Sequence, residues 1–245
     1  MRRIKGVGII GYKNSGKTFL IKNLAKKIKE KSQKRITIIK HSSSSIKLEE
    51  RVDTSILFDN SDRVIGLFED SKLELLKERE SYNDLIRTLD TDILIVEGFK
   101  SVKNLPKIIC INELEDIEKL SDGLEIGYFS LKKINSQKYR IWTIDDIEEI
   151  ANRIIEDGFL LPNINCGKCN ERTCYEFGLK LVSKKVDIYR CSYIKDKEPI
   201  TVTINNEEIV LNKFTADALK NIISAYLKTL KGIEKGPVEI KFELE

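Results

Sequence analysis

The string Gly11–Thr18, which reads Gly-Tyr-Lys-Asn-Ser-Gly-Lys-Thr, constrains the fold of this 245-residue chain more than any other feature. It matches the pattern G-x-x-x-x-G-K-[ST] and stands between a short apolar run, Ile4–Ile10, and an amphipathic stretch, Lys17–Lys31. In that context the glycines let the backbone aim successive N–H groups at phosphate oxygens, and the amino end of the helix adds its positive dipole. The string therefore predicts a phosphate-binding loop at the first strand-to-helix turn of an α/β domain.

The polar residues of this loop have predicted roles in holding a nucleotide. Lys17 is expected to contact the outer phosphates, and the hydroxyl of Thr18 to ligate Mg²⁺. A second metal ligand is expected from Glu97, which follows the apolar run Asp92–Val96 and so lies at the carboxyl end of a strand, where ligands bind in parallel sheets. Lys17 and Glu97 form the predicted catalytic pair. The predicted nucleotide-binding residues are Gly11, Asn14, Ser15, Gly16, Lys17, Thr18 and Asp53.

Two of the candidates follow the second predicted strand, Arg35–Lys40. Asp53 lies in the loop after it, where a switch segment would supply another carboxylate, although a solvated loop residue would look the same in sequence. His41, the only histidine, directly follows the strand and is predicted to face the same carboxyl edge. A lone histidine is more often structural, so a structural and a functional role both stay open for it.

The rest of residues 1–158 alternates apolar runs with amphipathic stretches. Strands that are apolar on both faces and separated by such helices indicate a mostly parallel sheet covered on both sides. The predicted fold is therefore an α/β P-loop NTPase domain, followed by a small cysteine module and a short α+β tail. The remaining predicted strands are Arg63–Phe68, Lys107–Ile111 and Arg140–Thr143, and the remaining predicted helices are Leu73–Leu89 and Asp145–Asp157.

Composition narrows the cellular setting and the partners. No apolar run approaches the roughly 18–20 residues that span a bilayer, and the apolar stretch near the N-terminus is too short for a secretory signal. We therefore predict a cytoplasmic protein without membrane contact. The net charge of +4, from 43 basic and 39 acidic residues, is too small to indicate a nucleic-acid binder, so no nucleic-acid partner is expected.

Four of the five cysteines fall in one segment with the spacing Cys-x2-Cys-x4-Cys-x16-Cys. In a cytosolic chain such clustering favours metal ligation over disulfides. The fourth thiolate is predicted to return after a helix that starts at the third. Cys110 stands alone inside an apolar run and is predicted to be a small buried hydrophobe. The predicted metal ligands are Cys166, Cys169, Cys174 and Cys191.

Four thiolates suit either zinc or an iron–sulfur cluster. Structural zinc sites commonly use two Cys-x-x-Cys pairs, whereas this segment has one, and three close ligands with a distant fourth suit a 4Fe–4S cube better. Six basic residues face three acidic ones between Cys166 and Cys191, which would compensate the negative charge of such a cluster. A 4Fe–4S cluster is therefore the main prediction, with zinc and unligated thiols as the alternatives.

The pattern changes at Gly158, which divides the chain into predicted domains 1–158, 159–197 and 198–245. Residues Phe159–Asn165 are expected to form a linker into the cysteine module, which we define as residues 159–197. Nothing in the tail suggests chemistry. It is predicted to contain a hairpin of 202–204 and 209–211 around Asn205-Asn206, a helix over about 217–230 and a half-exposed strand at 238–244.

Residues 1–157 resemble a known family, the molybdopterin-guanine dinucleotide biosynthesis protein B (MobB) family. The resemblance rests on the loop Gly11–Thr18, on Ile39-Lys40-His41, on the string Leu94-Ile-Val-Glu-Gly-Phe-Lys100, and on the closing segment Trp142–Ile150. It implies a GTP-binding domain with at most weak GTPase activity, in which Lys17 and Thr18 occupy the phosphate and Mg²⁺ positions and Glu97 is the strand-end acid. One departure is Ser42–Ser45, where the family often has further histidines or acids.

The cysteine module is similar to the 4Fe–4S domain of corrinoid iron–sulfur proteins, including Gly167 after its first cysteine. Together the two resemblances imply a GTP-binding accessory protein for molybdenum or tungsten cofactor biosynthesis that uses GTP, Mg²⁺ and a 4Fe–4S cluster. Its implied partner is a molybdopterin guanylyltransferase or a molybdoenzyme, and a homodimer is expected by analogy. The alternative functions are an ATP-dependent metallochaperone or iron–sulfur cluster carrier, and a redox-gated adaptor without catalysis.

Overall fold

A six-stranded sheet organises the larger of two compact units in this computed structural model, which describes residues 4–42, 53–77, 80–195, 202–204, 207–209 and 213–230. The larger unit comprises residues 2–196, and the smaller one holds residues 197–245. The strand order is β2-β5-β1-β6-β7-β8, and every neighbouring pair is parallel. The strands are β1 (Lys5–Gly11), β2 (Ile36–Lys40), β5 (Ile93–Glu97), β6 (Lys107–Cys110), β7 (Glu125–Phe129) and β8 (Ile141–Trp142).

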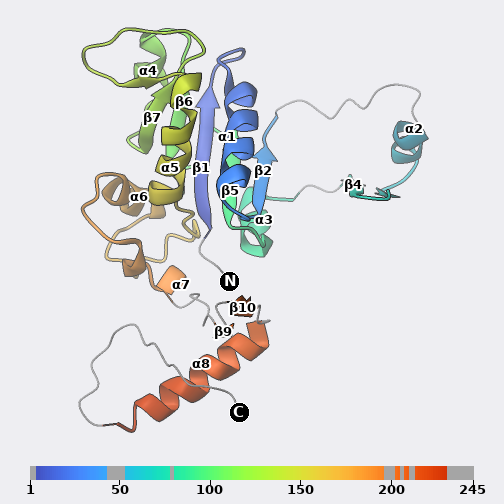
Figure 1. The fold of residues 1–245 in the computed structure, drawn as a ribbon, viewed down its shortest axis with the longest axis vertical. Helices are drawn as coiled ribbons and strands as arrows, with labels where there is room; N and C mark the ends of the chain where they lie inside the picture. The colour runs from blue at the N-terminus through green and yellow to red at the C-terminus, as the bar shows by residue number, and fades with distance from the viewer. Residues whose placement is uncertain are drawn as a thin grey trace. The chain divides into compact units, whose positions relative to one another are not determined.

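Helices cover both faces of the sheet because its central strands are apolar on both sides. Alternate residues of β5 enter different core clusters, Ile93 and Ile95 on one face and Leu94 and Val96 on the other. The first face is covered by α1 (Lys17–Lys31) and α5 (Ile147–Asp157), which lie side by side in front of the sheet (Figure 1). The other face packs against Ile86 of α3 (Tyr82–Thr88) and Ile117 of α4 (Glu115–Leu120). The predicted mostly parallel α/β fold is thus confirmed.

The prediction of a helix over Leu73–Leu89 is wrong in its first part. Residues Lys72–Leu76 form strand β4, which pairs antiparallel with β3 (Arg63–Leu67) as a separate two-stranded sheet. The turn between them is closed by the N–H of Phe68, which donates to the carbonyl of Ser71 over 2.8 Å. The helical part begins only at α3, because Ser81 caps the amino end by accepting from the N–H of Asp84. The predicted strand at Arg63 exists, but it lies outside the main sheet.

Strand β7 and helix α4 are absent from the sequence prediction. Helix α4 has six residues, too few for a clear amphipathic repeat. Strand β7 contains Gly127, whose presence weakens the strand pattern. The structure explains that glycine, because a Cβ there would lie 1.8 Å from the ring of Trp142 on the neighbouring strand. The indole of Trp142 therefore takes the space that a side chain at position 127 would need.

The start of the cysteine module is part of the core, which corrects the linker prediction for Phe159–Asn165. Phe159 and Leu161 are buried and pack with Cys174, Phe177 and Cys191 in one apolar cluster. A helix does begin at the third cysteine, as predicted: α6 spans Cys174–Val182. A short 3₁₀ turn (Ile188–Arg190) and helix α7 (Ser192–Lys195) flank the last cysteine.

The smaller unit contains the predicted hairpin and helix with shifted bounds. Strand β9 (Val202–Ile204) pairs antiparallel with β10 (Glu207–Ile209), and helix α8 spans Lys213–Leu227. The predicted strand at 238–244 lies outside the described residues. Among the helices that the structure describes, none is long and apolar enough to cross a membrane.

Candidate nucleotide and cysteine sites

Two glycines shape the phosphate loop, and glycine is favoured at each of them for a different reason. A Cβ at Gly11 would lie 2.4 Å from both the carbonyl oxygen of Cys110 and the hydroxyl oxygen of Ser15, so any larger residue would clash with backbone. Gly16, which precedes α1, has a φ of +85°, a left-handed conformation that favours glycine. Asn14 is also left-handed, with a φ of 63°. These positions wind Gly11–Thr18 into a tight turn between β1 and α1.

Two polar side chains of the loop, those of Lys17 and Ser15, are candidates for contacting a phosphate. The ammonium of Lys17 donates to the carbonyl of Tyr12 over 2.6 Å, so it reaches back across the loop. The hydroxyl of Ser15 is buried and has no hydrogen-bond partner within the part of the chain that the structure describes. A buried hydroxyl without a partner costs free energy, and a phosphate oxygen bound in the loop would satisfy it.

The two predicted magnesium ligands meet at the carboxyl edge of the sheet. The hydroxyl of Thr18, in the first turn of α1, donates to Oε1 of Glu97 over 3.0 Å. Glu97 is the last residue of β5 and is 9% exposed. Its own carbonyl accepts from the N–H of His41, which ties the ends of β5 and β2 together. A hydroxyl and a carboxylate in contact beside a phosphate loop are oxygen donors of the kind that Mg²⁺ binds.

The other two candidates at this edge have different outcomes. His41 stacks on Phe99 with ring centroids 4.0 Å apart and an interplanar angle of 15°, a contact that fits a packing role. The prediction that Asp53 lies in a loop is wrong, because Asp53 is the first residue of helix α2 (Asp53–Asp59). The side chain of Asp53 lies outside the described part of the structure, so its role in the site stays a prediction.

Cys110 lies directly beneath the phosphate loop. It pairs with Gly11 across the β1–β6 ladder and is fully buried, as predicted for a small hydrophobe. Burial raises the pKa of its thiol to about 12, while the positive charge of Lys17 lowers that pKa and the negative charge of Glu97 raises it further. The thiol is therefore protonated at neutral pH and has no place in thiolate chemistry.

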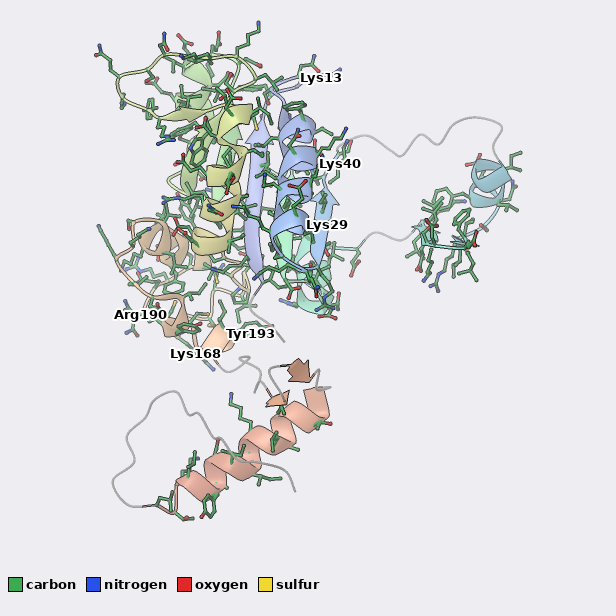
Figure 2. The ribbon with its side chains drawn as sticks, in the orientation of Figure 1. Lys13, Lys29, Lys40, Lys168, Arg190 and Tyr193 are labelled. Atoms are coloured by element: carbon green, nitrogen blue, oxygen red, sulfur yellow. The ribbon has the colours of Figure 1, made fainter. Side chains whose placement is uncertain are left out.

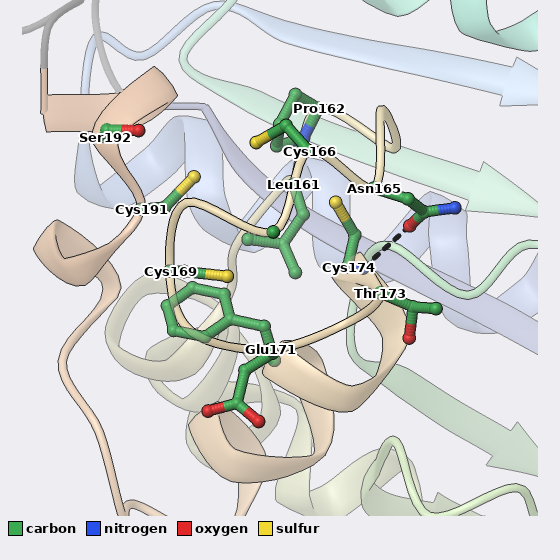
Figure 3. A pocket seen from close by; sticks show the side chains of 12 residues that line it. Leu161, Pro162, Asn165, Cys166, Cys169, Glu171, Thr173, Cys174, Cys191 and Ser192 are labelled. Atoms are coloured by element: carbon green, nitrogen blue, oxygen red, sulfur yellow. Dashed lines mark hydrogen bonds between the residues drawn. The ribbon is translucent and has the colours of Figure 1, made fainter.

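The four clustered cysteines line one pocket, which Figure 3 shows from close by. Cys166 is exposed, Cys169 is half-buried, and Cys174 and Cys191 are buried. The floor is apolar and includes Leu161, Pro162 and Phe177. Across the described residues, no three His, Cys, Asp or Glu side chains close around one point as ligands of a single ion would. Four soft thiol donors lining one apolar pocket are a donor set that suits either zinc or an iron–sulfur cluster.

The loop that carries the first cysteines is wound by residues in the left-handed conformation. These are Asn163, Asn165, Gly167 and Asn170, with φ values between 48° and 71°. Asn and Gly adopt this conformation at the lowest cost. Asn165 has a second role, because its side-chain oxygen accepts from the N–H of Cys174 over 2.8 Å (Figure 3). The concentration of Asn in this segment was a usable signal that sequence reasoning missed.

Two features contribute to the charge around the pocket: the Cys191 thiol with its neighbours, and the ion-paired carboxylate of Glu171. Burial raises the pKa of the Cys191 thiol; the backbone N–H groups of Ile194 and Tyr193 lower it, and the neighbouring Cys169 and Cys174 raise it. Beside the pocket, the carboxylate of Glu171 is 8% exposed and pairs with the ammonium of Lys180 at 2.7 Å. The guanidinium of Arg190 approaches the same carboxylate at 3.7 Å.

The two sites lie at opposite edges of the sheet. We call the carboxyl ends of the strands, with Gly11–Thr18 and Glu97, the nucleotide edge. The cysteine module is attached at the amino ends, which we call the cysteine edge: the N–H of Phe159 donates to the carbonyl of Gly6 at the start of β1. Strand β1 has seven residues, and about 3.3 Å per residue places the two edges about 20 Å apart.

Buried polar residues that sequence reasoning missed join the cysteine module to the sheet. Asn104 is fully buried; its amide donates to the carbonyl of Leu161, and its oxygen accepts from the hydroxyl of Tyr82. Lys107 is 1% exposed, and its ammonium contacts the carboxylate of Asp122 at 2.6 Å and the carbonyl of Lys100 at 3.0 Å. The carbonyl of Asp122 in turn accepts from the hydroxyl of Tyr175, next to Cys174.

A parallel sheet with a strand–phosphate-loop–helix turn at its carboxyl edge defines the larger unit as a P-loop α/β domain with a cysteine module appended. Residues 6–122 match the family model "Molybdopterin guanine dinucleotide synthesis protein B" (MobB), and residues 161–193 match the model "Putative Fe-S cluster". Over these two spans the chain is thus similar to the MobB family and, after it, to a putative Fe–S cluster domain. The crystal structure of Bacillus subtilis MobB is similar in fold, with a TM-score of 0.51 and 23% identity, covering 62% of this chain and 97% of that one.

Two curated proteins are similar in sequence. One, from Methanocaldococcus jannaschii, is named "Putative molybdopterin-guanine dinucleotide biosynthesis adapter protein" and is 27% identical over 248 residues, covering 98% of this chain and 97% of that protein. The other is the acetyl-CoA decarbonylase/synthase complex subunit gamma of Methanothermobacter thermautotrophicus, 46% identical over 39 residues. That second match covers 16% of this chain and 8% of the relative, so the similarity is local.

Proposed function

We propose that this protein is a GTP-binding accessory protein in molybdenum or tungsten cofactor biosynthesis, acting in formation of the molybdopterin guanine dinucleotide and carrying a 4Fe–4S cluster. The observation that carries the proposal is the pairing of Thr18 with Glu97, together with the buried hydroxyl of Ser15, which has no hydrogen-bond partner among the described residues. These groups lie within the span of the MobB family match. The full-length similarity to a relative named as a molybdopterin-guanine dinucleotide biosynthesis adapter supports the pathway.

In this proposal the nucleotide edge holds GTP with Mg²⁺. The backbone N–H groups of the loop and the ammonium of Lys17 would bind phosphate oxygens, and Lys17 would leave the carbonyl of Tyr12 to do so. Thr18 and Glu97 would contribute oxygen ligands to the metal, and Asp53 is the proposed additional carboxylate. Bound Mg²⁺ would neutralise phosphate charge. We expect at most a weak GTPase, because no arginine finger or water-orienting residue is evident at this site among the described residues.

At the cysteine edge the four thiolates would hold the cluster. Their distribution over an apolar pocket, with one Cys-x-x-Cys pair, favours 4Fe–4S over a single zinc ion. The cluster would supply one-electron redox chemistry or rigidity. The protein contributes the buried Cys174 and Cys191, the apolar floor, and the wound loop that presents the exposed Cys166.

The partners would be a molybdopterin guanylyltransferase or a molybdoenzyme, in the cytoplasm. A homodimer is also proposed, since α2 and the β3–β4 hairpin present apolar side chains to solvent that a second copy would cover. These exposed residues are Ile56, Leu57, Ile65, Leu67, Phe68, Leu73 and Leu76.

A second candidate function is an ATP-dependent metallochaperone or iron–sulfur cluster carrier. The observation that favours it is the exposure of Cys166, because a ligand at the surface allows an acceptor protein to reach the cluster. This candidate predicts a labile cluster that moves to an apo acceptor during nucleotide turnover. The main proposal predicts a cluster that stays bound through repeated turnovers.

The proposal is tested by calorimetric titration of anaerobically purified protein with GTP and with ATP in the presence of Mg²⁺. GTP is expected to bind at least tenfold more tightly than ATP. Lys17→Ala is expected to weaken GTP binding at least 100-fold. Lys13→Ala, which removes an exposed lysine of the same loop, is the matched control and should stay within about threefold of the wild type. Equal or tighter binding of ATP would overturn the proposed specificity and favour the carrier.

A further inference from the structure

Exposed cations stand beside the cluster cysteines. Lys168 lies between Cys166 and Cys169 in sequence, Arg172 is two residues before Cys174, and Arg190 immediately precedes Cys191. All three cationic side chains are exposed to solvent. Figure 2 labels Lys168 and Arg190, which both project from the cysteine module. Each exposed cation thus lies within two residues of a cysteine that would ligate the proposed cluster.

The acidic residues of the same segment do not neutralise this surface. The carboxylate of Glu171 is buried and contacts both Lys180 and Arg190. Glu176 is occupied at the start of α6, where its carboxylate accepts from the backbone N–H groups of Arg172 and Thr173. The ammonium of Lys168 and the guanidinium of Arg172 form no ion pair among the described residues. These two cations therefore face solvent with their charges uncompensated by the module.

The exposed cations and the accessible cysteine belong to the same loop. Cys166 is exposed and lines the pocket, so one corner of a bound cluster would lie at the protein surface. A role in compensating the negative charge of the cluster does not explain why Lys168 and Arg172 are basic, because water screens the charges of exposed side chains. The buried groups, namely the N–H donors to Cys191 and the Lys180–Glu171 pair, are better placed for that role.

We propose that this face, formed by Lys168 and Arg172 around Cys166, docks a small acidic electron-carrier protein that exchanges one electron with the cluster. The inference rests on the proposed function, since it needs the cluster. In the exchange, the reduced carrier loses one electron and the oxidised cluster of this chain gains it; no bond forms or breaks and no proton moves. An acidic protein fits because positive surface charge attracts it and speeds its encounter at low salt.

The experiment uses the full chain with its cluster reconstituted and a small acidic ferredoxin as the probe. Stopped-flow absorbance follows the reoxidation of reduced ferredoxin, and calorimetry measures its binding. We expect the second-order rate to fall at least tenfold between 20 mM and 300 mM salt. The double variant Lys168→Glu, Arg172→Glu is expected to lower the low-salt rate at least tenfold and to lose most of the salt dependence.

Two controls separate docking from other roles of these cations. Lys29→Glu reverses an exposed charge on α1, away from the cysteine module, and should leave both rate and binding unchanged (Figure 2). The midpoint potential and the visible spectrum of the double variant should match those of the wild type, as circular dichroism should match for the fold. A shifted potential together with an unchanged salt dependence would assign the cations to the cluster itself and overturn the docking inference.

The remaining outcomes decide between a failure of the docking inference and a failure of the proposed function. If the loaded wild type shows no salt dependence, or if the double variant behaves like Lys29→Glu, docking at this face is overturned while the proposed function stands. If the chain takes up no iron and sulfide, the proposed function falls and the docking inference falls with it. Iron and sulfide content, measured first on the same sample, tells these two failures apart.

Discussion

The nucleotide edge and the cysteine edge occupy opposite ends of one sheet, and they are built by different means. At the nucleotide edge, Gly11–Thr18 is a single continuous stretch whose backbone forms the candidate site, with Gly11 confined between Cys110 and Ser15. At the cysteine edge, the donors are side chains from a wound loop, the start of α6 and the residue before α7. A site formed by backbone groups of one segment therefore depends on the close packing of that segment. A site formed by cysteine side chains depends on several separate segments meeting at one place.

The sharpest way to break this comparison is to remove one buried thiolate. Cys174→Ser is expected to abolish stable cluster assembly, since the donor lies at the buried end of the pocket, and to leave nucleotide affinity within about twofold because the edges are about 20 Å apart. Iron and sulfide analysis together with calorimetry would measure both. Cys110→Ala, at a buried cysteine outside the pocket, should keep the cluster. Loss of nucleotide binding in Cys174→Ser would show that the two edges are not independent.

The second prediction concerns the ion pair between the buried Lys107 and Asp122, whose carbonyl also accepts from Tyr175 of the cysteine module. Lys107→Met would leave the carboxylate of Asp122 without its partner and is expected to lower the free energy of unfolding by about 3–5 kcal/mol. Lys119→Met, which removes an exposed lysine paired with Glu113 at 3.7 Å, should cost less than about 1 kcal/mol. Urea unfolding of both variants checks the difference. Equal effects would mean that burial gives the Lys107–Asp122 pair no special part in the stability of the fold.

The smallest expected effects come from substituting two glycines, one at the nucleotide edge and one in the cysteine module. Gly11→Ala is expected to destabilise the fold by about 1–3 kcal/mol through overpacking, and to weaken nucleotide binding strongly. At Gly167, with a φ of +71°, a Cβ would approach nothing closer than 4.0 Å, so Gly167→Ala should cost only the conformational penalty of about 1–2 kcal/mol.

Gly167→Asn separates the two causes, because asparagine adopts the left-handed conformation more readily than alanine. It should recover part of the stability that Gly167→Ala loses, with cluster content preserved, whereas Gly11→Asn should remain as damaging as Gly11→Ala. Thermal unfolding and iron content would measure the series. A Gly167→Asn variant as unstable as Gly167→Ala would mean that the pocket excludes side chains at that position.

Several elements followed from local pattern alone. Helix α1 spans the predicted residues Lys17–Lys31, and α6 begins at the predicted residue Cys174. Both begin at a feature that contiguous residues encode: the loop Gly11–Thr18 before α1, and the cap formed by Thr173 and Glu176 before α6. The failures have the opposite character. The sequence of Lys72–Leu76 has a helical pattern, but this segment pairs with Arg63–Leu67 in the structure. The pairing, rather than intrinsic secondary-structure propensity, makes it a strand.

Sequence by itself determined the candidate chemical groups of this protein: a phosphate-loop motif, a strand-end Glu97, and four cysteines in one segment. These are properties of residue type and short spacing, which survive without knowledge of distant contacts. Only the tertiary structure decided that Phe159 and Leu161 belong to the core, that Lys107 lies buried against Asp122, and that the two sites take opposite edges. Those outcomes depend on packing between segments far apart in the chain, where the free energy of burial, rather than local preference, selects the arrangement.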